Sequence, residues 1–226
     1  MVASKQFFPV SALSLRDQVV AQIRDAIIEG RLRPRDRIPE ITIAEQLGVS
    51  RTPVREALVI LEHEGLVVAT VNRGFCVRAF SALDVEHIFA MRILFENYAA
   101  ELNIERLNHQ DFVALEDLIE QQRIATIQGN FAQVRRIDMS FHRYLVAHSL
   151  QPLLLRNWTE LVAQIAALLS LRAKSVAYNE LLAIADHTRI IEAYKRRSLA
   201  EVLLENREIN RRVCSECVAA TRIERQ

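Results

Sequence analysis

The chain has 226 residues, of which 50% are hydrophobic and 25% are charged, with only five Gly and five Pro. So few turn-forming residues exclude collagen, low-complexity disorder and most β-sandwiches or barrels, which need a turn signal every ~8 to 12 residues. The formal net charge of +1 excludes a protein that binds nucleic acid through its overall charge, so any basic surface must be local. A mainly α globular protein remains.

The N-terminal end of the chain is predicted to be an arm followed by a helix. Residues 1–14 lack helical periodicity and contain a proline, which indicates an arm. From Leu15 the apolar residues recur at i, i+4 and i+8, which predicts a helix that begins after Ser14 and stops at Gly30. Residues 31–39 contain two prolines and alternating arginines, so we expect a connector there.

The next segment has the spacing of a helix-turn-helix. A short predicted helix over 41–47 and a second over 51–64 are each closed by a glycine. Two short runs rich in Val and Phe, 66–69 and 75–78, then predict a β-hairpin, because the Asn and Gly between them tolerate positive φ. Residues 15–79 are therefore expected to form a winged helix-turn-helix domain that binds DNA.

The remainder, residues 80–226, is predicted to be an all-α helical bundle. Gly129 and Pro152 separate two of the periodic segments clearly. The expected helices cover 81–107, 109–128, 130–149, 152–174, 177–196 and 198–223. The predicted fold class is thus mainly α, with an N-terminal winged helix-turn-helix and a C-terminal helical bundle.

The start of the helix over 51–64 carries groups suited to reading DNA. Arg51 and Arg55 are one turn apart on one face, with Thr52 beside them. A recognition helix reads major-groove base edges with its N-terminal residues, and Arg on guanine is the commonest specific contact. At the hairpin tip, Arg73 adds charge and Gly74 allows close approach to the nucleic acid. A lone arginine at a helix start is usually only solvated, but two in this arrangement favour base contacts.

Two residues of the bundle have the spacing of metal ligands. Asp138 and His142 are four positions apart, so both project from one face of the predicted helix, and His187 lies on a later helix. Taken alone, such a pair more commonly forms a simple hydrogen bond than a metal site. The spacing of Asp138 and His142 alone therefore does not identify a metal site.

Residues 15–79 resemble the winged helix-turn-helix of the GntR family. The resemblance rests on QIRDAI at 22–27, GRL at 30–32, IAEQL at 43–47, GVSRTPVREAL at 48–58, LE at 61–62, EGL at 64–66 and NRGF at 72–75. It implies that Arg51, Thr52 and Arg55 contact bases and that Arg73 and Gly74 form the tip of the wing. Ile38 before Pro39 departs conservatively from the leucine that is common in the family.

Residues 84 to about 220 resemble the FCD ligand-binding domain of the FadR subfamily. The resemblance rests on Arg92 and Glu96, DMSFH at 138–142 with Leu145, and His187 followed by IIEA at 190–193. Metal-binding members carry an Asp and three His around a divalent ion, and Asp138, His142 and His187 match three of these ligands. At the position expected for the fourth, this chain has Ile209, with Asn210 beside it.

The missing fourth ligand leaves two outcomes open. Three ligands can hold a metal with one position free for water or an effector carboxylate, with zinc favoured over nickel or manganese. Alternatively, the pocket binds its effector without metal. Arg92, expected in the same cavity as Asp138, His142 and His187, is a candidate for bidentate binding of an acidic effector. Its equally supported alternative is an ion pair with Glu96.

The function predicted from the sequence is that of a sequence-specific DNA-binding transcription regulator, most simply a homodimeric repressor, controlled by a small acidic effector. The partners are double-stranded operator DNA and the effector. The rival is a metal-dependent hydrolase using Asp138, His142 and His187, which lacks an obvious general base. Three cysteines without a disulfide framework, no apolar leader and no stretch of ~20 apolar residues predict a cytoplasmic protein without membrane contact.

Overall fold

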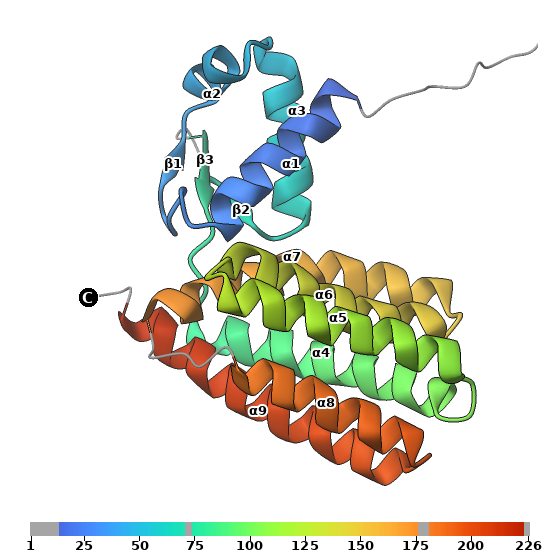
Figure 1. The fold of residues 1–226 in the computed structure, drawn as a ribbon. Coiled ribbons are helices and arrows are strands. Elements are labelled where there is room, and N and C mark those ends of the chain that lie inside the picture. The colour runs from blue at the N-terminus through green and yellow to red at the C-terminus, as the bar shows by residue number, and fades with distance from the viewer. Residues whose placement is uncertain (1–13, 71–73, 176–180, 224–226) are drawn as a thin grey trace, which may run out of the picture.

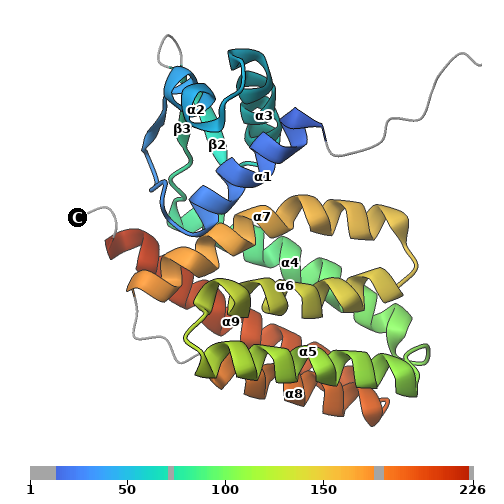
Figure 2. The ribbon, with the colours of Figure 1, turned by 45° about the horizontal axis from the view of Figure 1, so that its top comes forward.

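The computed structural model describes residues 14–70, 74–175 and 181–223. These residues form two packed units, a helix-turn-helix with a small sheet and, against one side of it, a helical bundle (Figures 1 and 2). Each unit has its own cluster of buried apolar side chains. The mainly α fold class predicted from the sequence is confirmed.

The first unit contains three helices and a three-stranded antiparallel sheet. Its elements are α1 (Leu15–Ile28), β1 (Arg37–Ile38), α2 (Glu40–Leu47), α3 (Arg51–His63), β2 (Val67–Thr70) and β3 (Gly74–Val77). The strand order is β1-β3-β2, and β1 pairs with β3 through Arg37 opposite Cys76. Strand β1 lies in the segment predicted to be a connector, because two residues are too short to show a strand's alternation.

Local signals explain why these helices begin and end where they do. Ser14 and Asp17 form a capping box at the start of α1. Gly48 ends α2 with a left-handed φ of 66°, which suits a residue without Cβ. The buried face of α3 carries Val54 and Leu58, both fully inaccessible, while its other face is exposed.

The second unit is a bundle of antiparallel helices. Its elements are α4 (Ala82–Asn103), α5 (His109–Ile127), α6 (Phe131–His148), α7 (Pro152–Ser175), α8 (Leu181–Lys195) and α9 (Leu199–Ile223). The helix predicted over 81–107 ends earlier, at Asn103, where a turn follows whose Arg106 and Leu107 N–H groups donate to the Asn103 carbonyl. The start predicted at residue 177 lies outside the described residues. None of the described helices is long and apolar enough to cross a membrane.

Helix α7 connects the two units by packing (Figure 2). Ala163 of α7 belongs to the core of the helix-turn-helix unit, and Ala167 packs against both cores. A Cβ added to Gly65, which follows α3, would lie 2.8 Å from Nε2 of Gln164. From α6, the Arg136 guanidinium lies 3.7 Å from the Glu29 carboxylate at the end of α1. The orientation of the first unit is therefore set largely by one helix of the second.

The contact between Gly65 and α7 can be tested with a matched pair of glycines. Gly65 and Gly129 both follow helices with φ of +71° and +68°, but a Cβ at Gly129 meets nothing within 4 Å. We expect Gly129→Ala to lower the free energy of unfolding by about 1 kcal/mol, the cost of a left-handed alanine. Gly65→Ala should cost more, because Gln164 must move, and adding Gln164→Ala should remove the excess. Urea unfolding followed by circular dichroism measures this, and equal losses would contradict the contact.

Candidate nucleic-acid interface and metal centre

The amino end of α3 is exposed at the far side of the first unit from the bundle (Figure 1). Arg51, Thr52 and Arg55 are all exposed there, whereas Val54 between them is buried. Ser50 occupies the N-cap position with extended backbone, but its side chain makes no capping hydrogen bond. The first N–H groups of the helix are thus left for another acceptor, such as a phosphate.

A shallow hollow of about 320 Å³ surrounds these side chains. Besides the two arginines and Thr52, it is lined by Glu40, the first residue of α2, and by Glu56. Sequence reasoning missed both glutamates, since Glu40 reaches the site only through the folding of α2 against α3. The guanidinium groups of the arginines can donate to guanine. A neighbouring glutamate carboxylate can accept from the amino group of cytosine.

The tip of the wing is described only in part. Arg73 and the neighbouring Asn72 lie outside the described residues, so the role predicted for Arg73 stays a prediction. Gly74 begins β3 with φ of +74°, and a Cβ added there would meet nothing within 4 Å. Its backbone conformation therefore favours glycine.

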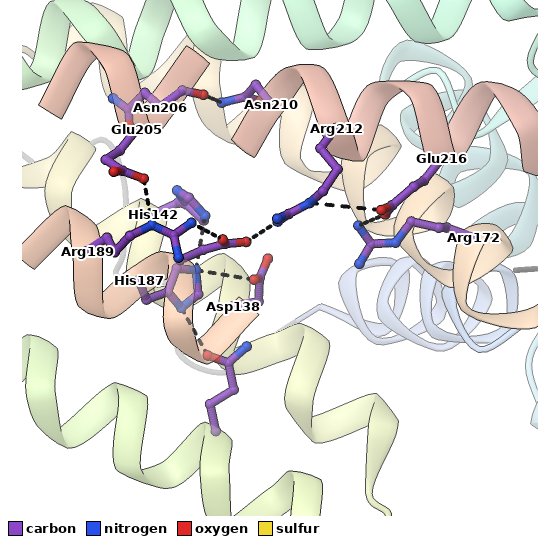
Figure 3. A network of polar contacts seen from close by, with 12 residues as sticks. Asp138, His142, Arg172, His187, Arg189, Glu205, Asn206, Asn210, Arg212 and Glu216 are labelled. Atoms are coloured by element: carbon purple, nitrogen blue, oxygen red, sulfur yellow. Dashed lines mark hydrogen bonds and ion pairs between the residues drawn. The ribbon is translucent and has the colours of Figure 1, made fainter. Parts of the chain in front are cut away.

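Helices α6 and α8 bring the three predicted metal ligands together (Figure 3). The donor atoms of Asp138, His142 and His187 all lie within 4.8 Å of one another. Nε2 of His187 is 3.3 Å from Nε2 of His142 and 3.3 Å from Oδ1 of Asp138. Both imidazoles are buried, and the Asp138 side chain is 16% exposed.

The outer nitrogen of each imidazole faces an acceptor. Nδ1 of His142 lies 3.2 Å from a carboxylate oxygen of Glu96, and Nδ1 of His187 lies 3.0 Å from the amide oxygen of Gln122. In the tautomer that carries its proton on Nδ1, each imidazole donates outward and keeps a lone pair on Nε2 for a metal. These lone pairs and the Asp138 carboxylate converge on one point, an arrangement that a cation at that point would stabilise.

The protonation states of these groups match those that metal ligands need. Burial alone would raise the pKa of Glu96, but the Arg92 guanidinium and His142 hold it well below its usual range. Burial likewise opposes ionisation of Asp138, yet His187, with smaller contributions from His142 and Arg92, keeps its pKa low. Burial lowers the pKa of His187 below 6.5, although Asp138 opposes this. Two ionised carboxylates thus lie next to a neutral imidazole.

The donor spacing fits a small divalent ion. Zinc–nitrogen bonds of ~2.0 to 2.1 Å in tetrahedral geometry place the ligand atoms about 3.3 Å apart, and two of the separations here are 3.3 Å. The outward hydrogen bonds to Glu96 and Gln122 are the outer-shell contacts that orient metal-binding histidines. On this chemistry, Asp138, His142 and His187 fit a metal.

The position expected for a fourth metal ligand holds Ile209, with Asn210 beside it, in place of a histidine. Ile209 lines the small cavity beside the three ligands. The buried Asn210 donates through Nδ2 to the Asn206 carbonyl at 2.9 Å and to Glu96 at 3.4 Å, while its Oδ1 has no hydrogen-bond partner. Asn210 therefore supports Glu96, the residue that orients His142, and one coordination position of the metal would stay open.

Arg92 forms an ion pair with Glu96, which is one of the two roles predicted for it from the sequence. Its Nε donates to Oε1 of Glu96 at 2.9 Å, and the guanidinium side chain is only 3% exposed. Recognition of an effector by Arg92 stays a prediction, although Arg92 does line the cavity next to Asp138.

Two further arginines that sequence reasoning missed also line this cavity (Figure 3). Arg172 of α7 pairs with Glu216 at 3.2 Å, and Arg212 of α9 pairs with Asp186. The cavity measures about 20 Å³, enough for roughly one water molecule. The lining holds three arginines and two aspartates, Asp138 and Asp186, so it offers both donors and acceptors to a small polar group.

The chain matches two family models, "Bacterial regulatory proteins, gntR family" over residues 15–77 and "FCD domain" over residues 87–205. It is 35% identical over 133 residues to the uncharacterized HTH-type transcriptional regulator YdhC of Bacillus subtilis, covering 58% of this chain and 59% of YdhC. It is 28% identical over 182 residues to a probable D-xylose utilization operon transcriptional repressor of Paenarthrobacter nicotinovorans, covering 79% of each.

A solved structure, that of McbR/YncC of E. coli, superposes with a TM-score of 0.77 at 24% identity. That match covers 95% of this chain and 100% of the other, and it shows the shared fold. The matched segment spans about three fifths of the first curated relatives' length.

The chain therefore belongs to the gntR family of bacterial regulatory proteins and carries an FCD domain after its helix-turn-helix. The family and the matched relatives are transcription regulators and not enzymes. The metal-dependent hydrolase considered from the sequence is accordingly not supported.

The buried ion pair can be tested by breaking it and then replacing it. Arg92→Met should lower the free energy of unfolding by about 3 to 5 kcal/mol, because it leaves the buried Glu96 without its guanidinium. Adding Glu96→Leu should recover part of this loss, since it also removes the acceptor of His142 and Asn210, whereas Arg123→Ala, in an exposed pair with Glu120, should change little. Urea unfolding at pH 7 in EDTA measures all three.

The same pair predicts a pH dependence. Because folding lowers the pKa of Glu96 below its unfolded value of ~4.3, its contribution to stability is present above that pH and is lost as the pH falls. The free energy of unfolding should fall less steeply with decreasing pH in the Arg92→Met/Glu96→Leu double variant than in the wild type. An equal decrease in both would contradict this account of Glu96.

Proposed function

We propose that this protein is a transcription regulator whose α3 helix reads an operator in the major groove. The observation that carries the proposal is the exposed cluster of Arg51, Thr52 and Arg55 at the amino end of α3, in a chain of the gntR family. The arginines contribute bidentate contacts to guanine, and the uncapped N–H groups at the same end contribute a phosphate contact. Arg73 and Gly74 contribute the tip of the wing. Because bacterial operator DNA lies in the cytoplasm, we propose that the protein is cytoplasmic.

The sign of regulation we propose is repression. Two matched relatives are named repressors, that of the D-xylose utilization operon and that of a gluconate operon in Bacillus licheniformis. A regulator bound at an operator that overlaps a promoter can block transcription by occupancy alone, and such repression needs no further surface.

The FCD domain is proposed to bind a small carboxylate effector through a divalent metal. Asp138, His142 and His187 would hold the ion, with zinc favoured and nickel or manganese as alternatives. The metal would supply a positive charge with one open position, and the cavity of about 20 Å³ beside it would have to widen to admit the effector carboxylate there. Arg172 and Arg212 on the cavity wall would bind the same anion, and Arg92 would act mainly by holding Glu96.

A second copy of the chain is proposed to pack against α4. Exposed apolar side chains lie along one face of this helix, namely Leu83 (58% exposed), Met91 (42%), Leu94 (58%) and Tyr98 (46%). Leu94 and Tyr98 also line an open groove, together with Leu154 and Arg207. A dimer through this face would present two α3 helices to a twofold operator.

The reading of DNA is tested with Arg55. After selection of an operator from random DNA, Arg55→Ala should lose about 1 to 3 kcal/mol of discrimination between the selected site and random DNA. Arg123→Ala on the exposed face of α5 serves as the control and should leave both affinities unchanged. Fluorescence anisotropy measures the affinities at one fixed salt concentration. Unchanged discrimination in Arg55→Ala would reject the base contact.

The metal is tested with two histidines of α6. Elemental analysis of the purified protein should find about one divalent ion per chain, and His142→Ala should lose it. His148→Ala is the matched control, because His148 lies on the same helix but pairs with Asp111 and is partly exposed. Unchanged metal content in His142→Ala, or a native protein that takes up none of zinc, nickel and manganese, would end the metal proposal and leave DNA binding untouched.

The dimer is tested with a charge on α4. Leu94→Glu should convert a dimer into a monomer in sedimentation velocity, since a buried carboxylate without a partner is costly. Ile124→Glu, at a 44% exposed position of α5, should remain dimeric. A wild-type monomer, or a dimer that survives Leu94→Glu, would remove α4 as the interface.

A further inference from the structure

A cavity of about 470 Å³ lies between the two units, away from the metal ligands. Its volume falls within the range of ~300 to 1,000 Å³ that is usual for small-molecule sites. The first unit contributes lining from α1, the connector after it and the sheet, and the second contributes lining from α7 and the end of α9. The lining residues include Arg33, Arg78, Phe80, Ala167, Ser170 and Leu171.

The lining has a definite chemistry. Most of its side chains are aliphatic or aromatic, its only ionisable residues among those described are Arg33 and Arg78, and no carboxylate borders it. Arg78 pairs with Asp84 at 2.6 Å and lies over the ring of Phe80. Arg33 is exposed, so its guanidinium can turn towards a ligand at the rim without leaving a buried partner.

Helix α7 separates this cavity from the metal centre. Ala167, Ser170 and Leu171 line the cavity between the units, whereas Leu169 and Arg172 line the small cavity beside Asp138. The two spaces therefore border different faces of one helix. A ligand in one need not displace a ligand in the other.

We propose that the cavity between the units is a second ligand site, which binds an organic anion with an apolar body of about one or two fused rings and a single acidic group. The apolar walls would bury the body, and Arg33 would pair with the acidic group. Because both units contribute walls, an occupant would hold the helix-turn-helix in one placement relative to the bundle. The site is independent of the metal and of the carboxylate effector.

The probe for this proposal is anilinonaphthalene sulfonate, with neutral N-phenyl-1-naphthylamine as its uncharged counterpart. Titration of the full-length protein should show one saturable site for the sulfonate, unchanged by EDTA. Arg33→Ala should weaken sulfonate binding about fivefold and leave the neutral probe unaffected. Arg31→Ala is the matched control, because Arg31 is an exposed arginine two residues away that does not line the cavity.

Two further variants locate the binding. Ala167→Leu, which fills the cavity, should weaken both probes, and Ile124→Glu at a 44% exposed position of α5 should weaken neither. No saturable binding, equal effects of Arg33→Ala and Arg31→Ala, or a loss confined to Ile124→Glu would each overturn the proposal. The arginine comparison needs no change in the core, so it decides the question even if Ala167→Leu does not fold.

Discussion

Helix α7 packs into the cores of both units, and this shared packing fixes where the recognition helix lies relative to the bundle. Ala163 is buried in the core of the helix-turn-helix, and Gln164 contacts the turn at Gly65. Two turns further along, Leu169 and Arg172 border the site that holds the metal ligands. A shift of α7 by a fraction of an ångström would disturb the packing of both units, because closely packed cores resist small deformations.

The candidate metal centre shows how local electrostatics prepares a site before a ligand arrives. Arg92 keeps Glu96 ionised, Glu96 accepts the outer N–H of His142, and the inner lone pair of His142 then faces His187 and Asp138. Each contact is costly when it lacks its partner, since every group is buried or nearly so. The proposed cation completes the chain of contacts. Ligand binding and stability of the bundle are therefore expected to depend on each other.

The elements that could be predicted from the sequence are those with a signal in consecutive residues. The glycines after α2 and α3, the Ser14 cap and the i, i+4 pair of Asp138 and His142 carry such signals. Strand β1 does not, because it forms only where the edge of β3 offers it partners. Gln122, 65 positions before His187, meets that residue only after α5 packs against α8. The arginines of the cavity wall were missed for the same reason, since no spacing links α7 to α9.

A coupling of the candidate metal centre to the helix-turn-helix unit through α7 is tested most directly by amide hydrogen exchange on the full chain. The comparison is between protein in EDTA and protein with zinc, with His142→Ala treated in the same way. We expect zinc to change exchange in α7 from Ala163 to Arg172 and in the turn at Gly65, and to change neither in His142→Ala. Zinc-dependent changes confined to α6 and α8, with α7 and the Gly65 turn unaltered, would contradict this account.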